Sequence, residues 1–399
     1  MNESDRQVVM NEEFARRFGS EPDVWVRAPG RVDLMGSHTD YNQGYVLTLS
    51  IDRDVWIAAR PRSGRRVTVY SLNVDGGGAF DLDGIAHDEV SPWTNYVRGV
   101  AHVLQGEGYQ LHGCDALIHS TVPVSSGLSS SAALEVATAM LFVLMGGWNV
   151  DPVRLALLCQ RAENQFVGVN CGILDQYTSV MGQSGCALLL DCRDLTSELV
   201  PVAEGMCMVI CDTRVKRELA GSAYAERRAQ CEEGARRLAR FYPTDAFYPA
   251  DVFYPRVRAL RDVTLGQFTA REGDLPAVVA RRCRFVIEEN ERVGRMGEAL
   301  PAGDRRAIAE LTSASYVGAR DLYEIGSPEM AAMMDAMLGA PGVIAARQAG
   351  AGFGGCMMAF VEETQTGAFV RHVEQAYTAA TGIQPQVYPT RAAAGAGPL

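Results

Sequence analysis

PVSSGLSSSAALE, residues 123–135, places Gly127 and five serines directly ahead of an apolar run that continues to residue 147. This run predicts a helix, because alanine, leucine and methionine favour helical backbone. It is apolar on nearly every side, so the helix should lie deep in its domain. The unpaired N–H groups at its start suit a phosphate, although the same pattern is that of an ordinary serine-capped helix. We call residues 123–135 the serine motif.

The flanking sequence alternates between predicted strands and helices. Residues 24–72 contain short apolar or alternating runs broken by turn residues, which predict strands. Residues 149–168 predict a helix with Asp151 as its N-cap and Pro152 in its first turn. Buried strands are predicted at residues 186–192 and 206–212, and helices dominate after that. We therefore expect a domain boundary near residue 200, giving domains 1–200 and 201–399.

The composition excludes several classes of protein. Of the 399 residues 47% are hydrophobic, which is ample for packed cores, and the net charge of −11 argues against nucleic-acid and anionic-membrane binders. The ten cysteines form no CxxC pair and predict reduced thiols in a cytoplasmic protein without zinc. The most apolar run contains Glu135, so it predicts a buried helix rather than a membrane span. The polar, acidic start shows no secretory signal.

A second polar stretch, GRVDLMGSHTDYN at residues 30–42, crowds short polar side chains into an apolar region. Arg31 could neutralise phosphate or act on a nearby carboxylate. His38, Asp40 and Asn42 are of the kind that bind sugar hydroxyls. The alternative is a polar loop held by its own turn hydrogen bonds. We call residues 30–42 the polar segment.

Two further features complete a possible site. GAGFGG, residues 350–355, would let backbone approach a ligand closely, or make a tight turn between packed strands; we call it the glycine motif. Of the two carboxylates Glu163 and Asp175, one could bind Mg²⁺ and the other could interact with a substrate hydroxyl. Their alternatives are a solvated helix face for Glu163 and a helix cap for Asp175. Together the features are the parts of a small-molecule kinase.

With these motifs in this order, the chain resembles the galactokinases of the GHMP kinase superfamily over nearly its whole length. The polar segment within RAPGRVDLMGSHTDYNQGYVL resembles the galactokinase signature, and the serine and glycine motifs resemble the superfamily's second and third motifs. CGILDQ, ENERV and GSPEM also match galactokinase-like segments, in the same order. The resemblance implies an α+β, two-domain GHMP kinase fold, with a ribosomal-protein-like N-terminal domain and a ferredoxin-like C-terminal domain. It also implies ATP and Mg²⁺ as cofactors.

The resemblance assigns roles by position. It implies Asp175 and Arg31 as catalytic residues, and Ser131 and Glu163 as Mg²⁺ ligands. The implied sugar-binding residues are Asp33, Ser37, His38, Asp40, Gly172 and Tyr224. The implied ATP-binding residues are Trp93, Ser125, Ser126, Gly127, Leu128, Ser129, Ser130, Ser131, Gly350 and Gly352.

Two positions depart from the galactokinase pattern. Asp33 stands where the family usually has Asn, and Ser37 where it has a Glu that contacts the sugar's C6 hydroxyl. The implied activity is phosphorylation of the C1 hydroxyl of galactose or a galacto-configured relative. Because Ser37 is short and uncharged, kinases for galacturonate, L-arabinose or a 6-deoxy sugar stay open. The alternative from a different functional class is a sensor that binds galactose and ATP without catalysis. The intact serine motif argues against this alternative.

Three lesser expectations remain. We expect a monomer or weak homodimer whose partners are a small sugar and ATP. The tail RAAAGAGPL, residues 391–399, should be frayed. FYP recurs at residues 241, 247 and 253, and predicts an extended surface connection.

Overall fold

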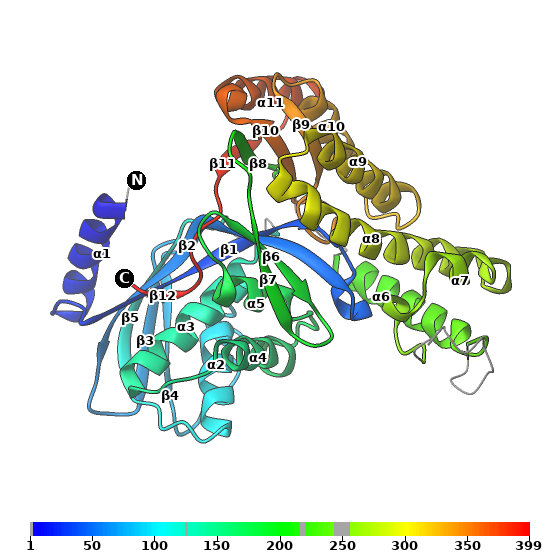
Figure 1. Cartoon of the computed structure of the whole chain (residues 1–399). Coiled ribbons are helices and arrows are strands. Elements are labelled where there is room, and N and C mark those ends of the chain that lie inside the picture. The colour runs from blue at the N-terminus through cyan, green and yellow to red at the C-terminus, as the bar shows by residue number, and fades with distance from the viewer. Residues whose placement is uncertain (1–2, 124–126, 216–219, 243–255) are drawn as a thin grey trace.

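The computed structural model describes residues 3–123, 127–215, 220–242 and 256–399. It has two β-sheets, each with its own helices (Figure 1). The predicted α+β class is confirmed, because helices pack against both sheets. The FYP repeats fall almost entirely in residues 243–255, outside the described part of the chain.

The larger sheet has the strand order β12-β1-β2-β5-β3-β4, with β6 added to β2 and β7 to β6. Its pairs are antiparallel except for β3 with β5. The strands are β1 (Val24–Met35), β2 (Tyr45–Pro61), β3 (Arg66–Ser71), β4 (Gly76–Asp81), β5 (Cys114–Ser120), β6 (Cys186–Asp191), β7 (Thr196–Pro201) and β12 (Gly397–Pro398).

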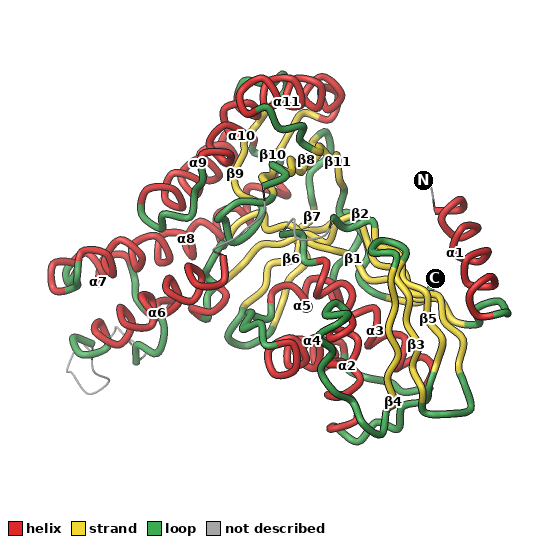
Figure 2. The backbone as a smooth tube through the Cα atoms, turned by 180° about the vertical axis from the view of Figure 1, so that it is seen from behind, coloured by secondary structure: helices red, strands yellow, loops and turns green. Residues whose placement is uncertain are grey.

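Helices cover both faces of this sheet, as Figure 2 shows from behind. Alternate residues of β2 point to opposite faces: Val55 and Ile57 pack in the main core, whereas Trp56 and Ala58 pack against α1 (Glu3–Phe18). The helices on the main-core side are α2 (Thr94–Gly106), α3 (Ser130–Gly146), α4 (Pro152–Ala162), η2 (Glu163–Val167) and α5 (Leu174–Met181). As predicted, α3 is deeply buried, and Asp151 caps α4 by accepting from the Arg154 N–H.

The second sheet is antiparallel with the order β11-β8-β10-β9. Its strands are β8 (Met206–Asp212), β9 (Val343–Gln348), β10 (Cys356–Glu362) and β11 (Gln386–Thr390). One face packs on α10 (Pro328–Leu338) and α11 (Thr366–Thr381). The other face shares a core with the first sheet, α8 (Ala277–Ala302) and α9 (Arg305–Asp321). Because this core contains both sheets, it fixes the two halves of the molecule against each other.

A helical arm extends from the second half and contributes one wall of the site. It contains α6 (Ala220–Leu238), η3 (Leu260–Asp262), α7 (Leu265–Thr269) and the N-terminal part of α8 (Figure 1). Buried side chains such as Phe268 and Phe285 form its own core. This arm places α6 beside the polar segment, where η1 (Asp40–Asn42) begins.

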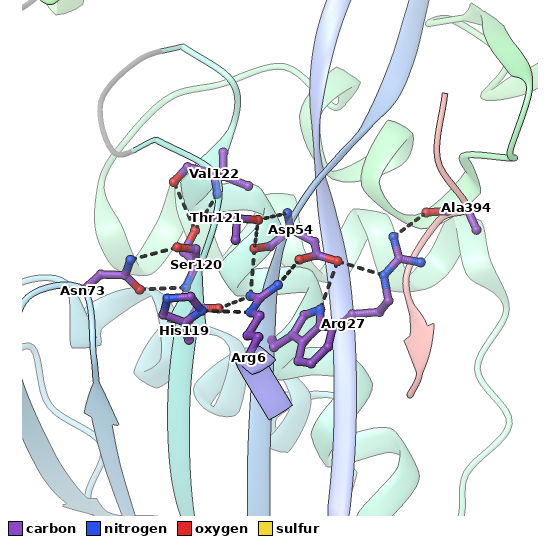
Figure 3. Close-up of polar contacts among 10 residues, drawn as sticks. Arg6, Arg27, Asp54, Asn73, His119, Ser120, Thr121, Val122 and Ala394 are labelled. Atoms are coloured by element: carbon purple, nitrogen blue, oxygen red, sulfur yellow. Dashed lines mark hydrogen bonds and ion pairs between the residues drawn. The ribbon is translucent and has the colours of Figure 1, made fainter. Parts of the chain in front are cut away.

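The N-terminal helix is anchored by a buried ionic network (Figure 3). The Arg6 guanidinium donates to Asp54 Oδ1 at 2.5 Å and to the backbone carbonyl of His119 at 2.6 Å. Asp54 also accepts from Arg27 and from the Trp56 indole N–H. Arg6 and Asp54 are both buried. The network therefore holds α1 against the C-terminal end of β5, from which the chain continues into the serine motif.

The expectation of a frayed tail is wrong. Residues 397–398 form β12, in which Gly397 pairs with Arg27 of β1. Upstream, the Ala394 carbonyl accepts from Arg27 Nη2, and the Ala396 N–H donates to the Ser179 carbonyl. Local composition suggested a loose end, but partners far away in the sequence hold it. The predicted boundary at residue 200 remains a prediction, and β12, from beyond it, joins the first sheet.

Candidate active site

A cavity of about 810 Å³ lies where the polar segment, the glycine motif, α5 and α6 meet. It brings together residues from four distant parts of the chain. The predicted site residues among its lining are Arg31, Asp33, His38, Asp40, Gly172, Asp175, Tyr224 and Gly352.

Strand β1 aims two of these residues at the cavity. Arg31 and Asp33 are two positions apart, so their side chains share one face of the strand. The register of β1 against β2 shifts on both sides of this pair, between Pro29 and Arg31 and between Asp33 and Met35. Such irregularities redirect side chains and are common beside active sites.

Arg31 is the ionic centre of the site. Its Nη2 lies 2.5 Å from Asp175 Oδ1 and its Nε lies 3.1 Å from Asp33 Oδ1. Its Nη1 donates to the Gly127 carbonyl at 2.7 Å. Burial acts to lower the pKa of Arg31, but Asp175 and Asp33 together raise it. The guanidinium therefore stays charged and ties Asp175 to the turn of the serine motif.

Asp40 and Gly172 approach each other closely. A Cβ atom at position 172 would overlap Asp40 Oδ2, so a larger residue here would have to displace this carboxylate. Burial raises the pKa of Asp40 to about 6, and the nearby carboxylates of Asp33 and Asp175 act in the same direction. The Asp40 carboxyl with this pKa is mostly ionised at pH 7 and gains its proton as the pH falls through about 6.

His38 links the polar segment to the glycine motif. Its Nε2 lies 2.9 Å from the Ala351 carbonyl, which can only accept, so Nε2 carries the proton. In the neutral ring Nδ1 then accepts from the Tyr41 hydroxyl at 2.9 Å. Both ring nitrogens are engaged by the protein, so the ring faces the cavity through its carbon atoms, 5.5 Å from the Tyr224 ring.

Ser37 is not among the residues that line the cavity, although it was expected to bind the sugar. It is buried, donates to the Gly350 carbonyl at 3.2 Å and lies 2.9 Å from Arg347 Nη2. Arg347 in turn pairs with Glu289 at 3.1 Å, and both side chains are fully buried. At this position the chain uses a short hydroxyl to hold an arginine rather than to reach into the cavity.

The described part of the serine motif from Gly127 onward turns tightly into α3. Gly127 and Ser129 have positive φ angles of 85° and 58°, and the helix begins at Ser130. The Leu128 carbonyl accepts from the Arg31 N–H at 3.2 Å. The positive end of α3 is therefore held next to Arg31, as an anion site requires. Ser125 and Ser126 lie outside the described residues.

Ser131 and Glu163 lie together behind this turn. Glu163 is 4% exposed, contrary to the alternative of a solvated helix face. Burial raises its pKa, while hydrogen bonds from Cys171, Ser131 and Gln176 lower it. A hydroxyl and a carboxylate oxygen are donors that Mg²⁺ accepts, with phosphate oxygens completing its shell. Within the described residues no three His, Cys, Asp or Glu side chains are grouped to hold a metal ion.

Trp93 and Gly350 are outside the cavity lining, as are Ser37, Glu163 and the predicted residues from Gly127 to Ser131. Trp93 directly precedes α2 and packs against the core of the first domain. Gly350 serves as the acceptor for Ser37. Their roles toward ATP remain predictions.

Two charged residues of the lining, Arg228 and Glu232, were not predicted from the sequence. They follow Tyr224 on α6 at spacings of four, which places all three on one face of the helix. Arg228 Nε donates to Glu232 Oε1 at 3.0 Å. The helical spacing from Tyr224 was the signal that could have found them.

Family models match three parts of the chain. The galactokinase galactose-binding signature covers residues 12–61, the GHMP kinase N-terminal domain residues 95–183 and the GHMP kinase C-terminal domain residues 296–378. In the described residues no helix has the length and apolar character of a membrane span.

Known proteins agree with these models. The chain is 42% identical to the galactokinase of Roseiflexus sp. (strain RS-1), across 97% of this chain and 96% of the relative. It is also 42% identical to that of Chloroflexus aurantiacus, across 96% and 95%. The crystal structure of Lactococcus lactis galactokinase complexed with galactose matches with a TM-score of 0.89 and 33% identity, across 98% and 99% of the two chains. The chain belongs to the galactokinase family of GHMP kinases.

Proposed function

We propose that this protein transfers the γ-phosphoryl group of ATP to the C1 hydroxyl of galactose, giving galactose 1-phosphate and ADP. The observation that carries the proposal is the Arg31–Asp175 ion pair, at 2.5 Å, on the wall of the 810 Å³ cavity. It lies where the polar segment meets the positive end of α3. Support for the sugar comes from the relatives, which are named galactokinases.

The chemistry divides among the chain's own residues. The C1 oxygen forms a bond to the γ-phosphorus, and the bond from that phosphorus to the β–γ bridging oxygen breaks, leaving the electron pair on ADP. Asp175 accepts the C1 hydroxyl proton, late in the transfer, because a loose transition state needs little prior deprotonation. Arg31 holds the Asp175 carboxylate in one orientation and adds positive charge beside the phosphates.

Ser131 and Glu163 would hold Mg²⁺. When bound there, the ion supplies charge neutralisation on the β- and γ-phosphates. The start of α3, from Gly127 to Ser131, would hold the phosphates through backbone N–H groups.

The cavity favours a neutral sugar. Asp33, Asp40, Asp175 and Glu232 line it against two arginines, so a galacturonate carboxylate would meet repulsion. Because Ser37 turns toward Arg347, L-arabinose and 6-deoxy sugars remain the second candidates. We further expect a monomer or weak homodimer in the cytoplasm. The ten unpaired thiols suit the reducing conditions of that compartment.

A coupled ADP-release assay tests the activity. Asp175→Asn should lose about 10²- to 10⁴-fold in kcat while ATP binding, measured by calorimetry, persists. The exposed Asp194→Asn serves as the control and should match the unaltered protein. Near-normal turnover by Asp175→Asn would contradict the assigned role. A panel of galactose, galacturonate, L-arabinose, L-fucose, talose and N-acetylgalactosamine then identifies the substrate.

A further inference from the structure

Behind Glu163 lies a buried polar cluster that the proposed mechanism does not use. Gln176 directly follows Asp175 on α5, and Glu135 lies on α3; both are 0% exposed. Gln176 Nε2 donates to Glu163 Oε2 at 2.6 Å and to Glu135 Oε2 at 2.9 Å. One amide therefore links three helical elements, α3, η2 and α5.

The two bonds are compatible with each other, because an amide nitrogen carries two hydrogens. Glu163 Oε2 also accepts from the Cys171 thiol at 3.1 Å. With Oε2 occupied twice, the orientation of the carboxylate is fixed. The Ser131 hydroxyl also bonds to the Glu163 carboxylate.

The arrangement has an energetic cost that packing alone does not explain. Glu135 Oε1 and Gln176 Oε1 are buried without a hydrogen-bond partner. Buried polar atoms left in this state disfavour the fold. An apolar pair at positions 135 and 176 would avoid this cost, so the cluster is better explained by what it does to Glu163.

We propose that Gln176, braced by Glu135, is a positioning residue that orients the Glu163 carboxylate toward the cation and phosphates beside Ser131. The inference rests on the proposed function, because it assumes that Glu163 binds a divalent cation. It adds a physical link between that cation site and the catalytic aspartate, since Asp175 and Gln176 are neighbours on one helix. Partners of this kind typically change metal affinity 10- to 100-fold when removed.

The test compares two glutamine substitutions of the same kind. Gln176→Met removes both donors and keeps the side chain's length. Gln160→Met is the matched control: Gln160 also lies near the cluster, but donates to the Cys171 carbonyl at 3.3 Å and to no carboxylate. If Gln176→Met does not fold, Gln176→Asn replaces it in the test. Asparagine is one methylene shorter, so its amide lies farther from both carboxylates.

The readout is Mn²⁺ binding to the full-length protein with a non-hydrolysable ATP analogue, followed by electron paramagnetic resonance. We expect Gln176→Met to weaken Mn²⁺ binding by about 10- to 100-fold, with galactose affinity unchanged and Gln160→Met unaffected. Unchanged Mn²⁺ affinity in Gln176→Met, with only a lowered melting temperature, would overturn the proposal. If the unaltered protein releases ADP but binds no Mn²⁺ with the analogue, the cation site fails while the kinase activity stands.

Discussion

Replacing Glu289 with glutamine removes one negative charge from the protein interior without changing the side chain's shape. Glu289 is fully buried between two arginines. Its Oε1 lies 3.1 Å from Arg347 Nη2, and its Oε2 accepts from Arg292 Nε at 2.8 Å. Oε1 also accepts from the Gly36 N–H at 3.0 Å, so the same carboxylate supports the polar segment.

The expected loss follows from Arg347, which is 0% exposed. Without the Glu289 charge, the hydrogen-bond acceptors that remain for Arg347 are neutral: the Ser37 hydroxyl, the Asp33 carbonyl and the amide oxygen of the new glutamine. Breaking a buried ion pair from one side costs about 3–5 kcal/mol. At about 2 °C per kcal/mol, the melting temperature should fall by roughly 6–10 °C.

The neighbouring residue supplies the control. Glu288 has a side chain that is 26% exposed and pairs with Arg292 at 3.5 Å. Glu288→Gln should cost less than about 1 kcal/mol. Differential scanning calorimetry of both variants at neutral pH measures the difference. Melting temperatures within about 1 °C of each other would refute the reasoning.

Two further measurements sharpen this test. Replacing both Glu289 and Arg347 with Met removes the unpaired Arg347 charge and leaves Arg292 with Glu288 as its ion-pair partner, so the double variant should recover part of the stability lost by Glu289→Gln. Burial acts to raise the pKa of Glu289, but Arg347 and Arg292 lower it below its ordinary 4.5. Its contribution is therefore present above pH 4.5 and lost as the pH falls through the folded-state value, where the variant and the unaltered protein should converge.

Three more predictions concern the sugar side and the N-terminal helix. Gly172→Ala should raise the galactose Kd roughly tenfold or more in calorimetry, because the new Cβ displaces Asp40, while ATP affinity stays unchanged. Galactose affinity should fall as the pH drops through about 6, where Asp40 gains a proton and loses an acceptor, and Asp40→Asn should show no such step. Arg6→Met should destabilise the fold by about 3 kcal/mol in urea titration, because it leaves Asp54 with only part of its network. Arg16→Met, whose side chain is 64% exposed, should change little.

Local signals predicted the elements that build the site. Asp151 and Pro152 marked the start of α4, and the apolar run after the serine motif marked α3, since capping and helix propensity act within a few residues. The strands β6 and β8 followed from their short apolar runs. These features depend little on distant parts of the chain, so the sequence alone could reveal them.

Contacts across the fold decided what the sequence could not. A solvated helix face was the alternative for Glu163, yet its side chain is 4% exposed and accepts from Gln176, 13 positions later. Ser37 was expected at the sugar, yet Arg347, 310 positions later, turns its hydroxyl away. Both partners come from segments that only tertiary folding brings near, and no spacing rule in one sequence reports such pairs.

The pairing of β12 with β1 has a consequence for synthesis on the ribosome. Arg27 and its acceptor Ala394 are 367 positions apart. At elongation rates of about 5–20 residues per second, roughly 20–70 s pass between the synthesis of this part of β1 and the synthesis of its β12 partner. During that time the nascent sheet exposes unpaired backbone at its border. The first sheet is therefore complete only after the C-terminal half has been synthesised. A fragment that ends at residue 200 would leave the backbone of β1 at this border unpaired.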